Sequence, residues 1–328
     1  MDFAKTLGLL ETEVAIKYIK DTFEKDLARA LKLTRVSAPL FVVPESGLND
    51  NLNGVERAVR FDVPAVKKEV EIVQSLAKWK RVALKDYGFS EYNGLYTDMN
   101  AIRRDEEVDE IHSIYVDQWD WEKIITAKDR KISYLKKTVK TIYATLKKLS
   151  FKLEQKYPYL KNNLPNEITF FSTKELEKLY PYLSRKERET AVTKQYGAVF
   201  IYGIGWPLKD GNPHDGRAAD YDDWKLNGDI LLWYDVLNIA LEISSMGIRV
   251  NGESLAKQLK AKKELHKLEN PYCKAVLSNE LPLTIGGGIG QSRLCMFFLR
   301  KKHIGEVQAS VWPENVRAEK LQENIRLL

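Results

Sequence analysis

The chain has 328 residues, 44% of them hydrophobic, so it can bury a full core as one large domain or two ordinary ones. Its 52 basic and 46 acidic residues are interspersed, and the net charge of +6 argues only weakly for nucleic acid and not at all for a membrane surface. No apolar run approaches the ~20 residues of a transmembrane helix, the N-terminus does not resemble a signal peptide, and the separated Cys273 and Cys295 are typical of reduced thiols in a cytoplasmic protein.

The N-terminal half of the chain shows clear helix and strand patterns. Residues 11–31 are predicted to form an amphipathic helix. Short strands are predicted at 41–43, 58–63 and 69–73, where Pro and Asn/Gly turns separate β-prone runs. Ser75 can cap a helix that ends near Gly88. Apolar residues at 3–4 spacing over 132–153 predict a second amphipathic helix, with a coiled coil as the alternative.

The C-terminal half mixes the two kinds of element. Capping boxes at Ser172 and Ser184 predict two helix starts. Buried strands are predicted at 198–203 and 229–233, a strand–turn–strand at 242–250 and a helix at 252–268. Because the elements do not alternate as regular βαβ units, we expect an α+β fold. No linker or repeat interrupts the chain, which predicts a single domain over residues 1–328.

Lys80 is the strongest candidate for a site residue from pattern alone. In the helix after Ser75, an inward stripe of Leu76, Trp79, Ala83 and Tyr87 would place Lys80 toward the interior. A buried ammonium group needs an anionic partner, because burying it alone costs several kcal/mol. The alternative is that the side chain extends to the surface.

A glycine-rich run, Thr284-Ile285-Gly286-Gly287-Gly288-Ile289-Gly290-Gln291-Ser292-Arg293-Leu294, dominates the C-terminal region. It is neither a P-loop nor a dinucleotide fingerprint, since GxxxxGK[ST] is absent and Gln291 stands where GxGxxG needs glycine. We interpret it as a glycine turn leading into a helix with an early arginine, and a turn closing on a buried helix is the structural alternative.

This run resembles motif 3 of the class II aminoacyl-tRNA synthetase fold. Residues 36–40 are similar to the end of motif 1, and 100–106 to motif 2. Segments 74–81, 117–122, 220–224 and 242–249 resemble a narrower family, the ammonia-dependent aspartate–ammonia ligases or asparagine synthetase A. The resemblance runs from about Thr12 to Arg317 and implies a central, mainly antiparallel sheet flanked by helices.

The resemblance also implies a reaction. L-aspartate, ATP and ammonia would give L-asparagine, AMP and pyrophosphate through a β-aspartyl-adenylate, with Mg²⁺ as cofactor. Position 2 is Asp2 rather than the cysteine of glutamine-dependent synthetases, so ammonia would come from solution. Pro39 in motif 1 implies a homodimer. The four histidines are scattered singly, which indicates no zinc site.

Site residues carry over from the resemblance. Lys80 and Arg249, with Ser75, would clamp the α-carboxylate, and Asp50 would accept from the α-ammonium group. Gln118 would bind the reacting β-carboxyl group, and Asp222, beside Asp223, would help to deprotonate ammonium. The remaining implied contacts are Asp120, Ser244 and Ser245 to the substrate; Arg103, Asp105, Glu242 and Arg293 to ATP; and Asp229, Glu242 and Asp235 to Mg²⁺.

Several alternatives stay open. Taken without the resemblance, Asp50 is an ordinary turn aspartate and Arg103 an exposed arginine in a charged loop. The run Trp224-Lys225-Leu226-Asn227 is shorter than the corresponding family segment, which leaves the role of the polar stretch 210–224 as a lid open. The rival functions are a class II synthetase-like enzyme that charges another acceptor and a non-catalytic paralogue.

Overall fold

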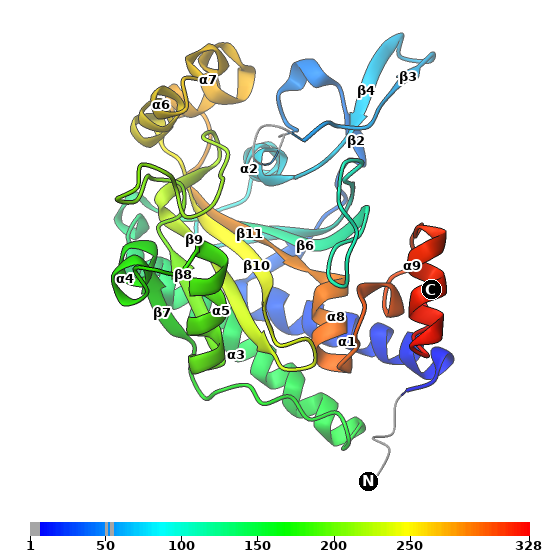
Figure 1. Ribbon diagram of the computed structural model, residues 1–328. Helices are drawn as coiled ribbons and strands as arrows, with labels where there is room; N and C mark the ends of the chain where they lie inside the picture. Colours follow the sequence, from blue (N-terminus) through cyan, green and yellow to red (C-terminus); the bar gives the residue numbers. More distant parts are fainter. Residues whose placement is uncertain (1–6, 50–51, 53–55) are drawn as a thin grey trace.

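The computed structural model describes residues 7–49, 52 and 56–328. Within these residues the α+β expectation is confirmed, because helices surround one sheet of eight strands and a smaller sheet of three (Figure 1). The order of the large sheet is β1-β5-β6-β11-β10-β9-β8-β7. These strands are β1 (Leu33–Arg35), β5 (Gly94–Ile102), β6 (Tyr115–Ile124), β11 (Thr284–Gly290), β10 (Ile239–Arg249), β9 (Asp222–Tyr234), β8 (Ala198–Tyr202) and β7 (Thr169–Ser172).

The large sheet is mixed, which corrects the expectation of a mainly antiparallel sheet. Strand β1 pairs with β5 in parallel and β7 with β8 in parallel, at the two edges, whereas the pairings between them are antiparallel. Parallel neighbours need a crossover connection, because a hairpin joins only antiparallel strands. The crossovers contain α2 (Ala77–Asp86) on one side and α4 (Thr173–Leu179) with α5 (Arg185–Tyr196) on the other.

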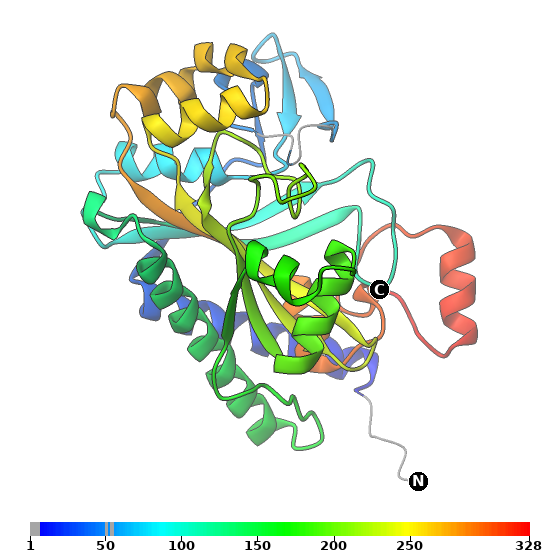
Figure 2. The ribbon, with the colours of Figure 1, turned by 60° about the vertical axis from the view of Figure 1, so that its left-hand side comes forward.

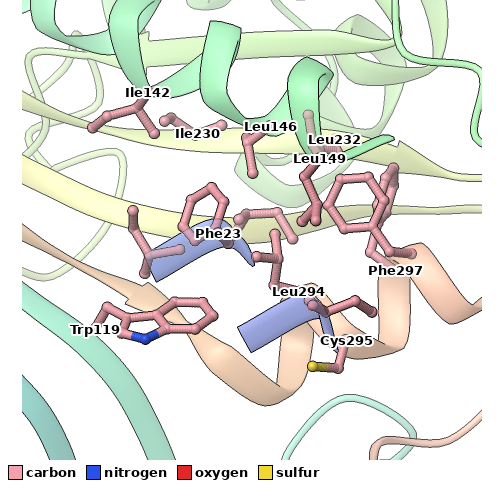
Figure 3. Close-up of a cluster of buried hydrophobic side chains, with 14 of the residues drawn as sticks. Phe23, Trp119, Ile142, Leu146, Leu149, Ile230, Leu232, Leu294, Cys295 and Phe297 are labelled. Atoms are coloured by element: carbon pink, nitrogen blue, oxygen red, sulfur yellow. The ribbon is translucent and has the colours of Figure 1, made fainter. Parts of the chain in front are cut away.

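Three helices cover one face of the large sheet. They are α1 (Leu9–Leu31), α3 (Ile132–Lys156) and α8 (Gln291–Leu299), and they pack on each other and on β6 and β9. Figure 3 shows the resulting core, where Phe23 of α1 meets Trp119 of β6 with ring centroids 5.1 Å apart. Leu146 and Leu149 of α3 pack in the same cluster. The prediction of an amphipathic helix packed on a core is therefore confirmed, in preference to the coiled coil.

Helix α2 lies on the opposite face of this sheet, together with α6 (Gly252–Ala261) and α7 (Pro271–Leu277) (Figures 1 and 2). Beside it stands the small sheet, in the order β2-β4-β3, with β2 (Phe41–Val42), β4 (Lys68–Ile72) and β3 (Arg60–Val63). Both capping boxes are confirmed, since Ser172 and Ser184 accept from the backbone N–H of Glu175 and Glu187. The remaining helical segments are η1 (Pro44–Ser46), η2 (Ala127–Asp129), η3 (Leu265–Glu269), η4 (Ile304–Glu306) and α9 (Glu314–Gln322).

The structure corrects the predictions for residues 242–250 and for the helix that follows them. Residues 242–250 do not turn, because Gly247 stays in the ladder opposite Asn227 and β10 continues to Arg249 across a register shift after Gly247. The helix expected over 252–268 ends at Ala261, where Lys263 takes a left-handed φ of 60° before η3 begins. No helix in residues 7–49, 52 and 56–328 is long and apolar enough to cross a membrane.

Candidate active site

A cavity of about 380 Å³ opens on the face of the large sheet that carries α2. Strand β6 contributes Gln118 and Asp120, while the alternate residues Trp119 and Trp121 point into the core on the other side. Because successive side chains of a strand point to opposite faces, β6 lines the polar cavity on one face and the apolar core on the other. Most predicted site residues line this cavity, namely Ser75, Lys80, Arg103, Gln118, Asp120, Asp222, Glu242, Ser244, Ser245, Arg249 and Arg293.

Lys80 points inward, as its position on α2 predicted. Its side chain is fully buried, and Nζ lies 2.5 Å from Asp120 and 3.0 Å from the carbonyl of Trp121. The anionic partner that a buried ammonium requires therefore comes from β6. The predicted inward stripe fails only at its end, where Tyr87 caps the helix and is 55% exposed. Ser75 precedes the N-cap, and its hydroxyl accepts from the N–H of Ala77.

Arg249, at the end of β10, is the second buried cation. Its guanidinium donates to both oxygens of Glu122, at 2.7 to 3.1 Å, and to Asp222 at 2.5 Å. Burial acts to raise the pKa of Glu122, but Arg249 and Lys80 hold it below its ordinary value. Burial raises the pKa of Asp222 in spite of the same guanidinium. Glu122 was missed from the sequence, although its alternation with Gln118 and Asp120 was a usable signal.

Two further arginines hold the backbone that carries Arg249. Arg81 of α2 donates to the carbonyl of Val250 at 2.8 Å, and Arg130 donates to the carbonyl of Arg249 itself. Arg130 also pairs with Asp223 at 2.9 Å, so it links β10 to the start of β9. These bonds fix the direction in which Arg249 leaves the strand.

The glycine run is strand β11, so its interpretation as a turn was wrong. Gly286, Gly287 and Gly288 pair with β6 on one side and β10 on the other. A Cβ on Gly286 would lie 1.9 Å from Oε2 of Glu122, and one on Gly288 would lie 2.2 Å from Oε1 of Gln118. The glycines therefore make room for the polar side chains of the neighbouring strand.

Arg103 follows β5 directly and lines the cavity near Glu106, 3.5 Å away. Its buried Nε has no hydrogen-bond partner in the described residues. Asp105, the predicted ATP contact, instead pairs with Arg57 and is not among the residues that line the cavity. Consecutive residues of a loop point in different directions, and motif spacing alone could not tell Asp105 from Glu106.

The predicted metal carboxylates are only partly brought together. Asp229 of β9 and Glu242 of β10 lie near Arg217, which pairs with Asp229. Burial, opposed by Arg217 but aided by Glu242, raises the pKa of Asp229 to about 7. Asp235 lies in the β9–β10 turn, where it pairs with Arg300 at 3.0 Å, and the structure does not bring it to the other two.

Arg293 and Asp50 complete the comparison with the predicted site. Arg293, in the first turn of α8, donates to the carbonyl of Glu242 at 3.1 Å. Asp50 lies outside the described residues. In the described part of the chain, no group of three or more His, Cys, Asp or Glu side chains forms a ready metal site.

Known proteins resemble the chain over nearly its whole length. The aspartate-ammonia ligase family matches residues 10–324. Aspartate–ammonia ligases of Bacillus cereus (strain G9842) and Bacillus mycoides (strain KBAB4) are 60% and 59% identical to the chain, covering 99% of it and of each relative.

Among solved structures, asparaginyl-tRNA synthetase from Pyrococcus horikoshii complexed with asparaginyl-adenylate has a TM-score of 0.67 at 15% identity, covering 92% of this chain and 70% of that one. Aspartyl-tRNA synthetase from Entamoeba histolytica has a TM-score of 0.56 at 15% identity, covering 91% and 58%. These structures share the class II synthetase fold with the chain, and the sequence match shows that the chain belongs to the aspartate–ammonia ligase family.

Proposed function

We propose that the chain makes L-asparagine from L-aspartate, ammonia and ATP. The β-carboxylate of aspartate attacks the α-phosphorus of ATP, which releases pyrophosphate and leaves β-aspartyl-adenylate. Ammonia then attacks the acyl carbon and AMP departs. The observation that carries this proposal is a pair of buried cations, Lys80 and Arg249, in the same cavity as Arg103.

The two buried cations select which carboxylate reacts. Lys80 and Arg249 are anchored by Asp120, Glu122 and Asp222 and so are oriented before substrate arrives. Holding the α-carboxylate there leaves the β-carboxylate free for activation. Asp50, Ser75, Asp120, Ser244 and Ser245 would complete the aspartate pocket.

Activation of the carboxylate falls to the loop after β5 and to β6. Gln118 would donate to the β-carboxyl group and later to the product amide. Arg103 would bridge the attacking carboxylate and the α-phosphate, where charge builds up in the transition state. Its unpartnered Nε supports this role, because a buried donor without a partner is costly and is satisfied by a ligand. Glu106 and Arg293 would contact the nucleotide.

Asp229 and Glu242 fit a magnesium ion that accompanies ATP. Magnesium is held by one or two protein carboxylates together with phosphates and water, and Oδ1 of Asp229 is buried without a hydrogen-bond partner among the described residues. The ion would neutralise charge on the polyphosphate. Asp235 lies in the β9–β10 turn, apart from this pair of carboxylates, and is not preferred.

Asp222 would serve the ammonia step. It lines the cavity, and burial raises the pKa of its carboxyl group above the ordinary value of an aspartate. Its carboxylate would attract ammonium and take the proton that must leave before nitrogen can attack.

Assembly and location belong to the same proposal. We expect one catalytic domain per chain, a homodimer formed through the region of Pro39, and a cytoplasmic enzyme that takes ammonia from solution. No nucleic-acid or membrane partner is needed for the reaction.

The test follows asparagine and pyrophosphate together in the purified protein with aspartate, ATP, Mg²⁺ and ammonium. Matched formation of both, with no replacement of ammonium by glutamine, supports the ligase. Pyrophosphate exchange without asparagine would point to another acceptor, for which tRNA is tested next. Silence in both assays would leave a non-catalytic paralogue.

A further inference from the structure

Arg217 lies at the carboxylates proposed for magnesium, although its sequence position suggested no role. It sits in the irregular segment 203–221 between β8 and β9 and lines the cavity. Its guanidinium donates to Asp215 and to the carbonyl of Gly216, each at 2.8 Å, and pairs with Asp229 of the sheet.

The charges around Arg217 explain why a cation must be there. Asp229 is 5% exposed, and a buried carboxylate without a counter-charge is strongly unfavourable. Asp215 and Glu242 add negative charge to the same region and contribute to the raised pKa of Asp229. An arginine keeps its charge at any working pH, so Arg217 is a permanent counter-ion for these carboxylates.

The bonds of Arg217 divide into two groups. Asp215 and Gly216 belong to its own segment and move with it, whereas Asp229 belongs to β9. Releasing Asp229 therefore breaks an ion pair with the sheet while the local contacts persist. Oδ1 of Asp229 has no hydrogen-bond partner in the described residues, so this carboxylate is not saturated by Arg217 alone.

We propose that Arg217 is the resident cation of the Asp229–Glu242 site in the nucleotide-free enzyme. Its guanidinium holds Asp229 until magnesium arrives with ATP, and it then turns to the polyphosphate, whose oxygens suit a planar guanidinium. The exchange keeps the carboxylates neutralised before and after binding, and it makes metal binding weak until the nucleotide is present. This inference rests on the proposed function.

Metal binding to the nucleotide-free protein tests the exchange directly. Mn²⁺ is titrated by calorimetry into the wild type, Arg217→Gln and Arg217→Lys, without ATP. Removing the competing unit charge should lower the Mn²⁺ dissociation constant of Arg217→Gln about tenfold or more. Lysine lacks the fork that contacts two carboxylates, so Arg217→Lys should show a smaller decrease of about threefold.

Two controls limit the interpretation. Arg185 of α5 donates to Asp210 and to the carbonyl of Pro213, which both lie in segment 203–221. Arg185→Gln should leave the Mn²⁺ affinity at the wild-type value. The double variant Arg217→Gln/Asp229→Asn should lose the gain in affinity. Circular dichroism checks that each variant folds. If Arg217→Gln does not fold, the Mn²⁺ affinity of Arg217→Lys decides the test.

Mn²⁺ affinity that is unchanged or weaker in both Arg217 variants would overturn the resident-cation role. If the wild type nevertheless makes asparagine normally, the proposed function is still supported. Wild-type protein that makes no asparagine would remove the proposed function, while the calorimetric comparison would still decide whether Arg217 occupies the carboxylate site.

Discussion

Lys80 illustrates how a single buried charge links stability to substrate binding. Its ammonium group is neutralised by Asp120, yet it lies at the wall of the cavity, where a second anion can join the network. We expect Lys80→Ala to raise the KM for aspartate at least ~30-fold, because losing one member of a buried charged pair costs about 2–5 kcal/mol. Calorimetry should show ATP binding largely intact.

The control for this prediction lies on the same helix. Lys85 of α2 is an exposed residue that pairs weakly with Glu280, at 3.4 Å, so Lys85→Ala should bind aspartate normally. Equal aspartate affinity in Lys80→Ala and the wild type would refute the clamp.

Arg103 is placed to act on the transition state rather than on the bound substrate. Arg103→Gln should lower the rate of aspartate-dependent ATP–pyrophosphate exchange about 10²–10³-fold, the usual effect of removing one preorganised donor. The adjacent Arg104, 3.9 Å from Asp105, offers a matched control, and Arg104→Gln should exchange at close to the wild-type rate. Normal pyrophosphate release by the Arg103 variant would exclude its role.

Asp222 separates the two half-reactions. Its pKa is raised by burial, so the group takes up a proton as pH falls through a value above that of an ordinary aspartate. Asparagine formation should therefore decline on the acid side, and the contribution of this group to folding stability declines as pH rises through the same value.

The variant Asp222→Asn tests the role of this carboxylate in the ammonia step. At saturating aspartate it should keep pyrophosphate exchange and lose asparagine formation. Hydroxylamine, a nucleophile that is mostly uncharged near neutral pH, should still give aspartyl hydroxamate. Equal loss with both nucleophiles would mean that Asp222 is not needed for proton removal.

At the scale of elements, β11 determines the spacing of the site. Its glycines let Glu122 and Gln118 of β6 lie across the neighbouring strand, and Glu122 in turn orients Arg249. A strand with side chains at these positions would push both groups away. The glycine run thus allows close packing within the sheet and also leads into α8.

Gly286→Ala should disturb both folding and binding, because its Cβ would lie 1.9 Å from Glu122. We expect a loss of about 1–3 kcal/mol in the free energy of unfolding, as for other overpacked sites, together with weaker aspartate binding. Gly252→Ala in α6 is the control, since its Cβ would meet its nearest neighbour at an ordinary 3.6 Å. Urea denaturation and an aspartate titration compare the two, and equal behaviour would contradict the packing argument.

At the scale of the whole molecule, the segment after β1 leaves apolar surface uncovered. Leu40 and Phe41, which follow Pro39, are 51% and 44% exposed. We expect light scattering to give twice the 37.8 kDa of one chain. Leu40→Glu should shift the protein toward the monomer, because a charge would be buried at the contact. Leu321→Glu, on the 66% exposed Leu321 of α9, should not, and a wild-type monomer would exclude the dimer.

The sequence by itself determined the local features and the family. Amphipathic spacing predicted α1 and α3, the two capping boxes predicted the starts of α4 and α5, and an inward Lys80 followed from its place on a helix face. These patterns depend on neighbours a few residues apart, which is why they can be read without the fold. Long, distinctive segments also identified the family, which the comparisons confirm.

Only the tertiary structure decided which residues meet. It showed that the glycine run is a strand between two others, that Glu106 and not Asp105 lines the cavity, and that Asp235 is engaged elsewhere. It also brought Glu122 and Arg217 to the site. Such contacts join residues that are distant along the chain, through strand register and loop direction, and no local spacing encodes them.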